Sequence, residues 1–243
     1  MTKKNNLEIL DNLQQPVPVS FKVIGTGTGT TDIIEKVKSF GYDCVSCIIA
    51  ESPSECIPMD DDKVVIIVAR DNEEVANMIA KTYHDAAVLT LGLLEEADIT
   101  CFDSVIKNAS GKDYPNIIKA LLQPIVTEGY ICYDFNDLCT TLRDTRFFKT
   151  LIAEGKDVET SVAKMQTAFD SEGVEVSRIE YLSAHLYCNR QRQPAITMKD
   201  LAYLSDMLSK MPESVNTIWS MNIDNMMASD QIRFTIIMSG KEI

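Results

Sequence analysis

Alternating apolar and polar stretches divide the first part of the chain into short strands and helices. Residues 19–24 form an apolar run that leads into a glycine-rich turn, residues 25–32, followed by the helical pattern IIEKVKSFGY. Residues 44–50 and 64–69 read as further strands, and the second of these, VVIIVA, is apolar at every position. Such a run predicts a strand covered on both faces, and therefore a parallel sheet between layers of helices.

The same half continues with another helix, another strand and a long helix. Asp71 is expected to cap a helix that extends to about residue 83, residues 86–93 form a strand, and residues 114–128 form the long helix. Pro124 is expected to kink the end of this helix, because proline lacks the backbone N–H. The order of elements predicts a doubly wound α/β domain.

Beyond residue 145 the pattern predicts a second α/β lobe with a mixed sheet. A helix at residues 134–145 leads into it, Thr197 caps its amphipathic helix, and two strands at residues 217–224 and 231–239 close it as a hairpin. We predict four parts: a loose tail (1–15), a shortened first domain (16–113), a central helix with the following loop and helix (114–145), and a C-terminal lobe (146–243).

Composition restricts the class of partner. The chain has 243 residues, 45% of them hydrophobic, which is enough to bury a core, and a formal net charge of −13. A field of that sign repels phosphate backbones and anionic lipids, so we expect neither nucleic acid binding nor membrane insertion. The N-terminal residues lack the pattern of a signal peptide, and the expected location is the cytoplasm.

Seven cysteines in irregular positions are expected to be reduced. Cys44 and Cys47 form a C-x-x-C pair that could be a redox motif or half of a zinc site, but they lie in an apolar stretch typical of a core strand. His84 and His185 are the only histidines in the chain, so we expect no metal site.

The glycine-rich turn is the first candidate site. A strand, a glycine-rich turn and a helix N-terminus together present backbone N–H groups to an anion. The P-loop lysine is missing, and Thr30 stands where a dinucleotide fingerprint has its third glycine, although Glu51 lies about 20 residues further on, as that fingerprint requires. The alternative is a tight turn without a ligand. The candidate residues are Gly25, Thr26, Gly27, Thr28, Gly29 and Thr30.

A second motif carries a family resemblance. Residues 124–142 read PIVTEGYICYDFNDLCTTL and resemble the end of the central helix and the catalytic loop of FtsZ, the prokaryotic relative of tubulin. Gly129, Asp134, Phe135 and Asp137 match that loop, whereas Cys132 replaces an asparagine. The resemblance implies that Asp134 and Asp137 are the motif carboxylates, which act on the nucleotide of the next subunit. The alternative for Asp134 is a helix cap.

The resemblance covers residues 19–240. The turn at residues 25–32 matches the first phosphate loop of FtsZ, and residues 232–240 resemble its last strand. It implies an FtsZ/tubulin-like fold: a Rossmann-like, mostly parallel sheet domain, a central helix, and a second α/β lobe with a mixed sheet.

The chain departs from this family at the nucleotide pocket. The signature loop GGGTGTG is replaced by Arg70-Asp71-Asn72-Glu73-Glu74, and the region before Tyr114 that would hold the base is shortened. One carboxylate about 4 Å from a phosphate charge costs about 4 kcal/mol at an effective dielectric constant of about 20. We therefore expect a residual, weak site at residues 25–30 and no cofactor.

Three hypotheses remain open at this point. The first is a pseudoenzyme, a cytoskeletal or cell-division protein that acts by assembling head to tail with itself or with an FtsZ-type partner. The second is an active, polymerising GTPase that binds GTP or GDP with Mg²⁺ in an unconventional pocket. The third is a dinucleotide-dependent oxidoreductase, which leaves the second lobe unexplained.

Overall fold

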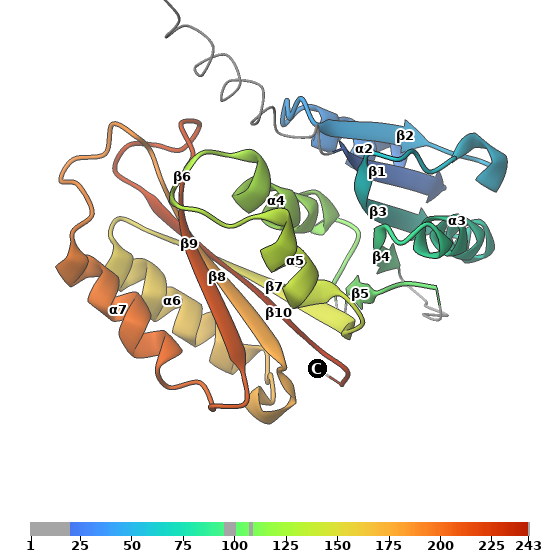
Figure 1. The fold of residues 1–243 in the computed structure, drawn as a ribbon. Coiled ribbons are helices and arrows are strands. Elements are labelled where there is room, and N and C mark those ends of the chain that lie inside the picture. Colours follow the sequence, from blue (N-terminus) through green and yellow to red (C-terminus); the bar gives the residue numbers. More distant parts are fainter. Residues whose placement is uncertain (1–19, 95–100, 107–108, 243) are drawn as a thin grey trace, which may run out of the picture.

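The computed structural model describes residues 20–94, 101–106 and 109–242, and one ten-stranded sheet runs through them (Figure 1). The strand order is β2-β1-β3-β4-β5-β7-β10-β8-β9-β6. The strands are β1 (Ser20–Gly27), β2 (Val45–Ile49), β3 (Asp62–Arg70), β4 (Leu89–Leu94), β5 (Ser104–Ile106), β6 (Gly129–Ile131), β7 (Arg146–Gly155), β8 (Tyr181–Cys188), β9 (Asn216–Ile223) and β10 (Ile232–Gly240). The helices are α2 (Thr31–Lys38), α3 (Glu73–Asp85), α4 (Tyr114–Val126), α5 (Phe135–Leu142), α6 (Val158–Ser171) and α7 (Met198–Leu208), with short 3-10 helices at Pro53–Glu55 and Val176–Arg178.

The first half of the sheet is parallel and doubly wound, as the sequence predicts. Strands β2, β1, β3, β4 and β5 pair in parallel. Val64 and Ile66 on β3 pack on one face with α2 and α4, whereas Val65 and Ile67 pack on the other face with α3. The run VVIIVA is therefore buried on both sides, which is why it shows no alternation of apolar and polar residues.

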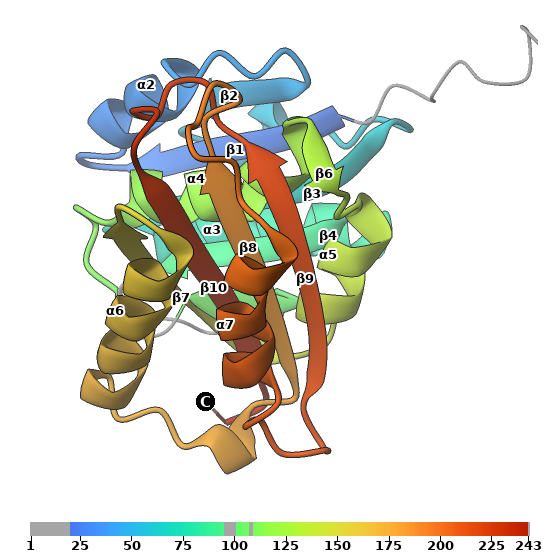
Figure 2. The same cartoon turned by 90° about the vertical axis from the view of Figure 1, so that its left-hand side faces the viewer.

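The second half of the sheet is mixed, and the predicted closing hairpin is wrong. Strand β10 lies between β7 and β8 and is antiparallel to both, while β9 lies parallel to β8 on its far side (Figure 2). Every residue of β10 except Arg233 is buried. A strand with so little exposed surface needs a backbone partner on each side, and the edge position of a terminal hairpin would leave half of its polar groups unpaired.

A three-residue pairing joins the two halves of the sheet. Strand β5 runs parallel to the start of β7, with Ser104 opposite Arg146 and Ile106 opposite Phe148. The N–H of Arg146 also donates to the carbonyl of Asp103 at 2.9 Å. The region between the predicted strand at residues 86–93 and the long helix is thus the place where the parallel sheet continues into the mixed one.

Two local predictions need correction. The helix that starts at Glu73 has Asn72 at its N-cap position, without a side-chain cap hydrogen bond, so Asp71 is not the cap. Asp71 instead adopts a left-handed backbone conformation, with φ of 58°. The glycine-rich turn also begins later than predicted, because β1 extends through Gly27.

A buried cluster of charged and polar side chains connects α4 to the second half of the sheet. Asp224 is 5% exposed and its carboxylate accepts hydrogen bonds of 2.7 Å from both Gln123 and Arg233. The ammonium of Lys119 lies 3.6 Å from the same carboxylate, and the Arg233 guanidinium stacks on Tyr187 at 4.7 Å. Burial raises the pKa of Asp224, but the bonds from Gln123 and Arg233 outweigh it and hold this pKa below its usual value.

We predict that Asp224→Asn lowers the free energy of unfolding by about 3 kcal/mol, because it leaves the buried Arg233 without its counter-charge. The measurement is urea denaturation at neutral pH. Glu175→Gln is the matched control, since Glu175 pairs with Arg178 on the surface and such pairs contribute about 0–1 kcal/mol. Equal losses in the two variants would contradict a structural role for the cluster.

Candidate functional site

The glycine loop connects the end of β1 to the start of α2. Gly27 and Gly29 have positive φ angles of 86° and 74°. A Cβ at Gly27 would lie 1.7 Å from the carbonyl oxygen of Arg70, so only glycine allows β1 to lie this close to the end of β3. Residues 27–29 are exposed, whereas Thr26 and Thr30 are buried.

The three threonines of the loop hydrogen-bond to the protein itself. Thr30 Oγ1 donates to the carbonyl of Gly27 at 2.9 Å, and Thr28 Oγ1 donates to the Asp71 carboxylate at 2.5 Å. Thr26 Oγ1 accepts a bond from the Asn72 amide at 2.9 Å. The bonds of Thr28 and Thr26 tie the glycine loop to residues 71 and 72, which follow β3.

The side chain of Arg70 occupies the space between the glycine loop and the segment that precedes α4. A Cβ at Gly29 would lie 3.3 Å from Arg70 Nη1, and one at Gly111 would lie 3.3 Å from Arg70 Cζ and 3.5 Å from its Nε. The guanidinium therefore lies between the two glycines, each of which lacks the side chain that would crowd it. From the sequence, Arg70 is only the first residue of the segment that replaces the signature loop, and the position of its guanidinium cannot be predicted.

The acidic motif lies at the other end of α4. The side chain of Asp134 accepts hydrogen bonds from the N–H groups of Asn136 and Asp137 at 2.7 and 3.0 Å, and Asp137 Oδ2 accepts from the N–H of Asp134 at 3.0 Å. The two carboxylates thus form a capping box at the start of α5. The structure brings Asp134 and Asp137 together, but the 13 residues of α4, about 20 Å of helix, separate them from the glycine loop.

A buried polar network, which the sequence does not predict, lies beneath the acidic motif. His185 Nδ1 lies 2.7 Å from Ser220 Oγ and its Nε2 lies 3.1 Å from Ser183 Oγ, while Tyr133 packs edge-on against the imidazole. Asn222 donates to Ser220 at 2.7 Å. Burial lowers the pKa of His185 to about 3, so the ring is neutral. Only the scarcity of histidine in the sequence could have drawn attention to it.

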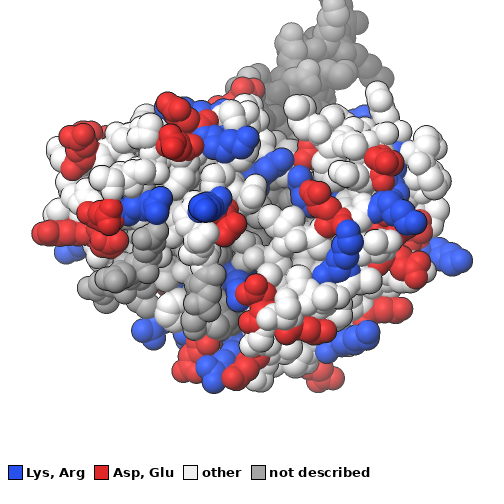
Figure 3. Space-filling model, turned by 180° about the vertical axis from the view of Figure 1, so that it is seen from behind, with Lys and Arg blue, Asp and Glu red and all other residues white. Residues whose placement is uncertain are grey.

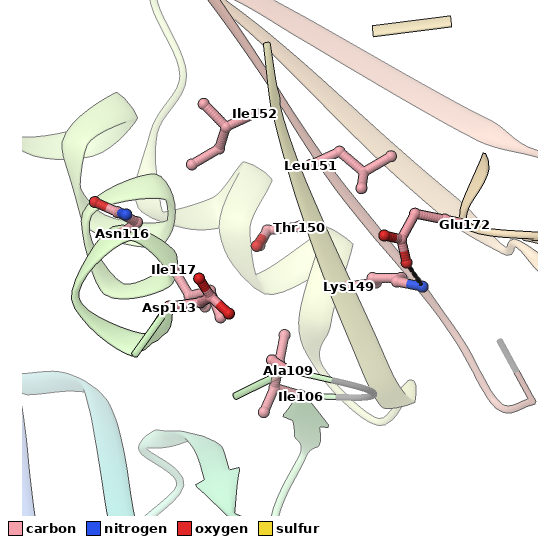
Figure 4. A pocket seen from close by; sticks show the side chains of 10 residues that line it. All are labelled: Ile106, Ala109, Asp113, Asn116, Ile117, Lys149, Thr150, Leu151, Ile152 and Glu172. Atoms are coloured by element: carbon pink, nitrogen blue, oxygen red, sulfur yellow. Dashed lines mark ion pairs between the residues drawn. The ribbon is translucent and has the colours of Figure 1, made fainter. Parts of the chain in front are cut away.

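Four of the cavities in the described part of the chain lie along α4 and α7, and no residue of 25–32 lines these four. One, of about 310 Å³, separates the first turns of α4 from β7 and is bordered by the Lys149–Glu172 ion pair at 2.5 Å (Figure 4). Acidic and basic side chains are interspersed over the face shown in Figure 3. Among the described residues, no group of three or more His, Cys, Asp or Glu side chains is placed to hold a metal ion.

The cysteine pair has no features of a reactive site. Cys47 lies in β2 and Cys44 just before it, and both are free, partly exposed thiols. The expectation of a core strand is wrong, because β2 is an edge strand of the sheet. Burial raises the pKa of each thiol, which disfavours the reactive thiolate. In the described residues, no helix combines the length and apolar character that a membrane crossing requires.

Comparison with known proteins places this arrangement in a known fold. No family model matches the sequence, and no curated protein matches it. An empty FtsZ dimer from M. jannaschii superposes with a TM-score of 0.72 at 15% sequence identity, covering 99% of this chain and 93% of that one. TubZ of Bacillus thuringiensis serovar israelensis, in GDP-form protofilaments, superposes with a TM-score of 0.61 at 12% identity, covering 97% and 89%.

The chain has the FtsZ/tubulin fold. A helical model of a four-stranded TubZ-Bt filament agrees, with a TM-score of 0.63 at 11% identity over the whole of this chain and 92% of that one. At such identities the comparison establishes the fold only. The FtsZ/tubulin fold thus confirms the architecture that the motif at residues 124–142 implied.

We predict that Asp134→Ala lowers the free energy of unfolding by about 1 kcal/mol, because α5 loses its N-cap. Asp134→Asn keeps an oxygen that can accept the same bonds, so it should retain most of the stability. Urea denaturation of both variants checks this. If the asparagine variant loses as much as the alanine variant, the charge of Asp134 matters and not its capping bonds.

We predict a pH dependence of stability that belongs to His185. Its pKa is 6.5 in the unfolded chain and about 3 in the folded one, so the unfolded state takes up a proton that the folded state cannot hold. The free energy of unfolding should therefore decrease as the pH is lowered, by about 2 kcal/mol from pH 6.5 to pH 5 as the contribution of this group alone.

The test compares unfolding curves at several pH values. His185→Gln should lose this part of the dependence. His84→Gln, which changes the other histidine of the chain, should keep it. Identical pH dependence in wild type and His185→Gln would refute the assignment.

Proposed function

We propose that the chain acts by association, head to tail with itself or with an FtsZ-type protein, and not by GTP hydrolysis. The observation that carries the proposal is the position of Arg70, whose guanidinium lies between Gly29 and Gly111. By the resemblance, nucleotide phosphates would lie against the glycine loop. The Arg70 side chain fills the space between the two loops in which such a ligand would lie.

The charge around Arg70 supports the same conclusion. Asp71 and Glu74 are exposed and Glu73 is partly exposed, and all three follow Arg70 directly in the chain. The two glutamates lie in the first turn of α3, where acidic side chains interact favourably with the helix dipole. They therefore stabilise the helix end at which a phosphate would otherwise bind.

The hydrogen bonds of the acidic motif are consistent with a protein in which this loop is retained but GTP hydrolysis is lost. Asp134 and Asp137 hold the start of α5 through the capping box. A loop fixed in this way has a defined shape without a bound nucleotide. It can therefore serve as a contact surface in the absence of catalysis.

The neighbours in fold space favour association as the function. Their structures are described as an FtsZ dimer, as TubZ protofilaments and as a four-stranded TubZ filament. Self-association is thus the property that these proteins share in their solved forms. We infer the same general property for this chain, with no cofactor.

We predict that the protein, purified without added nucleotide and then denatured, releases no stoichiometric GDP or GTP into the supernatant. Anion-exchange chromatography with ultraviolet detection provides the measurement, and an FtsZ with an intact signature loop serves as the positive control. Stoichiometric GDP or GTP would overturn the proposal in favour of an active GTPase with an unconventional pocket. Release of NAD would support the oxidoreductase.

The association itself is tested by sedimentation velocity over a range of concentrations, alone and with an FtsZ-type protein, with and without GTP and Mg²⁺. The proposal expects head-to-tail oligomers or a mixed complex that do not depend on GTP. A monomer under all these conditions would contradict it. Assembly that requires GTP would again favour the active GTPase.

A further inference from the structure

Strand β9 leaves part of one edge of the sheet open. On its inner side it pairs with β8 along its whole length, from Asn216 to Ile223. On its outer side, within the described part of the chain, it pairs only with β6, through Met221 and Asn222. Residues 216–220 therefore form a five-residue window at the edge, visible beside α7 in Figure 2.

The hydrogen-bond pattern shows which groups point outward from this window. The N–H of Asn216 donates to Glu180 and that of Asp224 donates to Cys188, so even-numbered residues of β9 bond toward β8. The N–H of Ile223 donates outward, to Glu128. The alternation along a strand then directs the N–H and C=O of Thr217 and Trp219 away from β8, toward the open side.

A groove without charged side chains accompanies the open edge. It has a volume of about 430 Å³ and lies between α7 and β9, where Thr217 and Trp219 face the helix. No charged side chain lines the groove, although 24% of the residues in the chain are charged. Its wall on the helix side is formed by Leu201, Leu204, Ser205 and Leu208 of α7 and by Ser209, which follows the helix.

The window is complementary to itself. In an antiparallel pair centred on Ile218, Thr217 of each copy lies opposite Trp219 of the other, and both have their polar groups pointing outward. This register forms four backbone hydrogen bonds. In each copy the pairing extends from Asn216, where β9 begins, to residue 220, next to the residues that pair with β6, so it uses the whole window.

The side chains favour the same register. Thr217 and Trp219 project to the α7 side of the sheet, so the two grooves meet on one face of the pair. Each indole can then contact the leucines of the other groove. Two copies that each carry a charge of −13 repel one another, and a groove lined by no charged side chain adds no like-charge contact of its own.

We propose that the open edge of β9 is a dimer interface, at which a second copy of this chain adds its own β9 in antiparallel orientation and joins the two sheets. The occupant is a second copy because the window is self-complementary in hydrogen bonds, length and lack of charge. The dimer is closed by its two-fold symmetry, unlike a head-to-tail chain. It does not depend on the proposed function.

The test uses the only tryptophan of the chain, Trp219. Its emission should shift to longer wavelength as the protein is diluted, because the indole leaves the partner's groove and contacts water. Sedimentation velocity should show dimer converting to monomer over the same concentrations. Constant emission together with a monomer up to the solubility limit would overturn the proposal.

Two variants locate the interface. Thr217→Pro removes an outward N–H in each copy while leaving the bonds to β8 intact, and an edge strand tolerates proline at such a position. It should weaken the dimer at least about tenfold, since two of the four backbone bonds disappear. Thr217→Val, which keeps the N–H, is the matched control and should dimerise like wild type.

Leu208→Lys provides a second route if the proline variant folds poorly. It places a charge in the groove from the last residue of α7, where a lysine suits the helix dipole. It should also abolish the dimer. Dimerisation of folded Thr217→Pro and of Leu208→Lys at wild-type strength would refute the interface, whereas species larger than a dimer that persist in both variants would report head-to-tail association.

Discussion

The buried carboxylate of Asp224 constrains the whole molecule, because it holds α4 against the mixed half of the sheet. Two cations, Lys119 and Arg233, share this one acid. A buried ion pair contributes little more net stability than an apolar contact of similar size would. Unlike an apolar contact, however, it is satisfied only when the charged groups meet in one geometry, so it specifies how α4 lies against the sheet. Since α4 starts beside Gly111 and ends before the acidic motif, this arrangement also sets the separation of the two candidate sites.

The glycines of the first loop are explained by packing alone. A Cβ at Gly25 would lie 2.7 Å from the side chain of Ile34, and one at Gly27 would overlap the carbonyl of Arg70. The fold therefore requires both glycines whether or not an anion binds. A glycine-rich turn between a strand and a helix is consequently weak evidence for a phosphate site. The position of the Arg70 side chain is more informative about what the space beside the loop contains.

Local patterns predicted the fold well where one segment determines its own structure. The run VVIIVA, the helix cap at Thr197 and the helix predicted at residues 114–128 are such cases. Strands β5 and β6 have three residues each, too few to show a period, and the place of β10 depends on partners distant in sequence. Of the candidate site, the loops could be predicted, but not the path of Arg70 or the network around His185.

Acidic side chains of other segments lie beyond both ends of α4, and this affects how copies can meet. Asp71 and Glu74 lie near its start, and Asp134 and Asp137 lie beyond its end. In the head-to-tail pair that we propose, these groups would approach one another, with Arg70 as the nearby cation between the loops. Such contacts are weakened unless a cation or a less acidic partner intervenes. Within the proposed function, an FtsZ-type partner with a less acidic pocket face therefore suits the acidic motif better than a second copy does, whereas the proposed dimer places a second copy at the uncharged edge of β9.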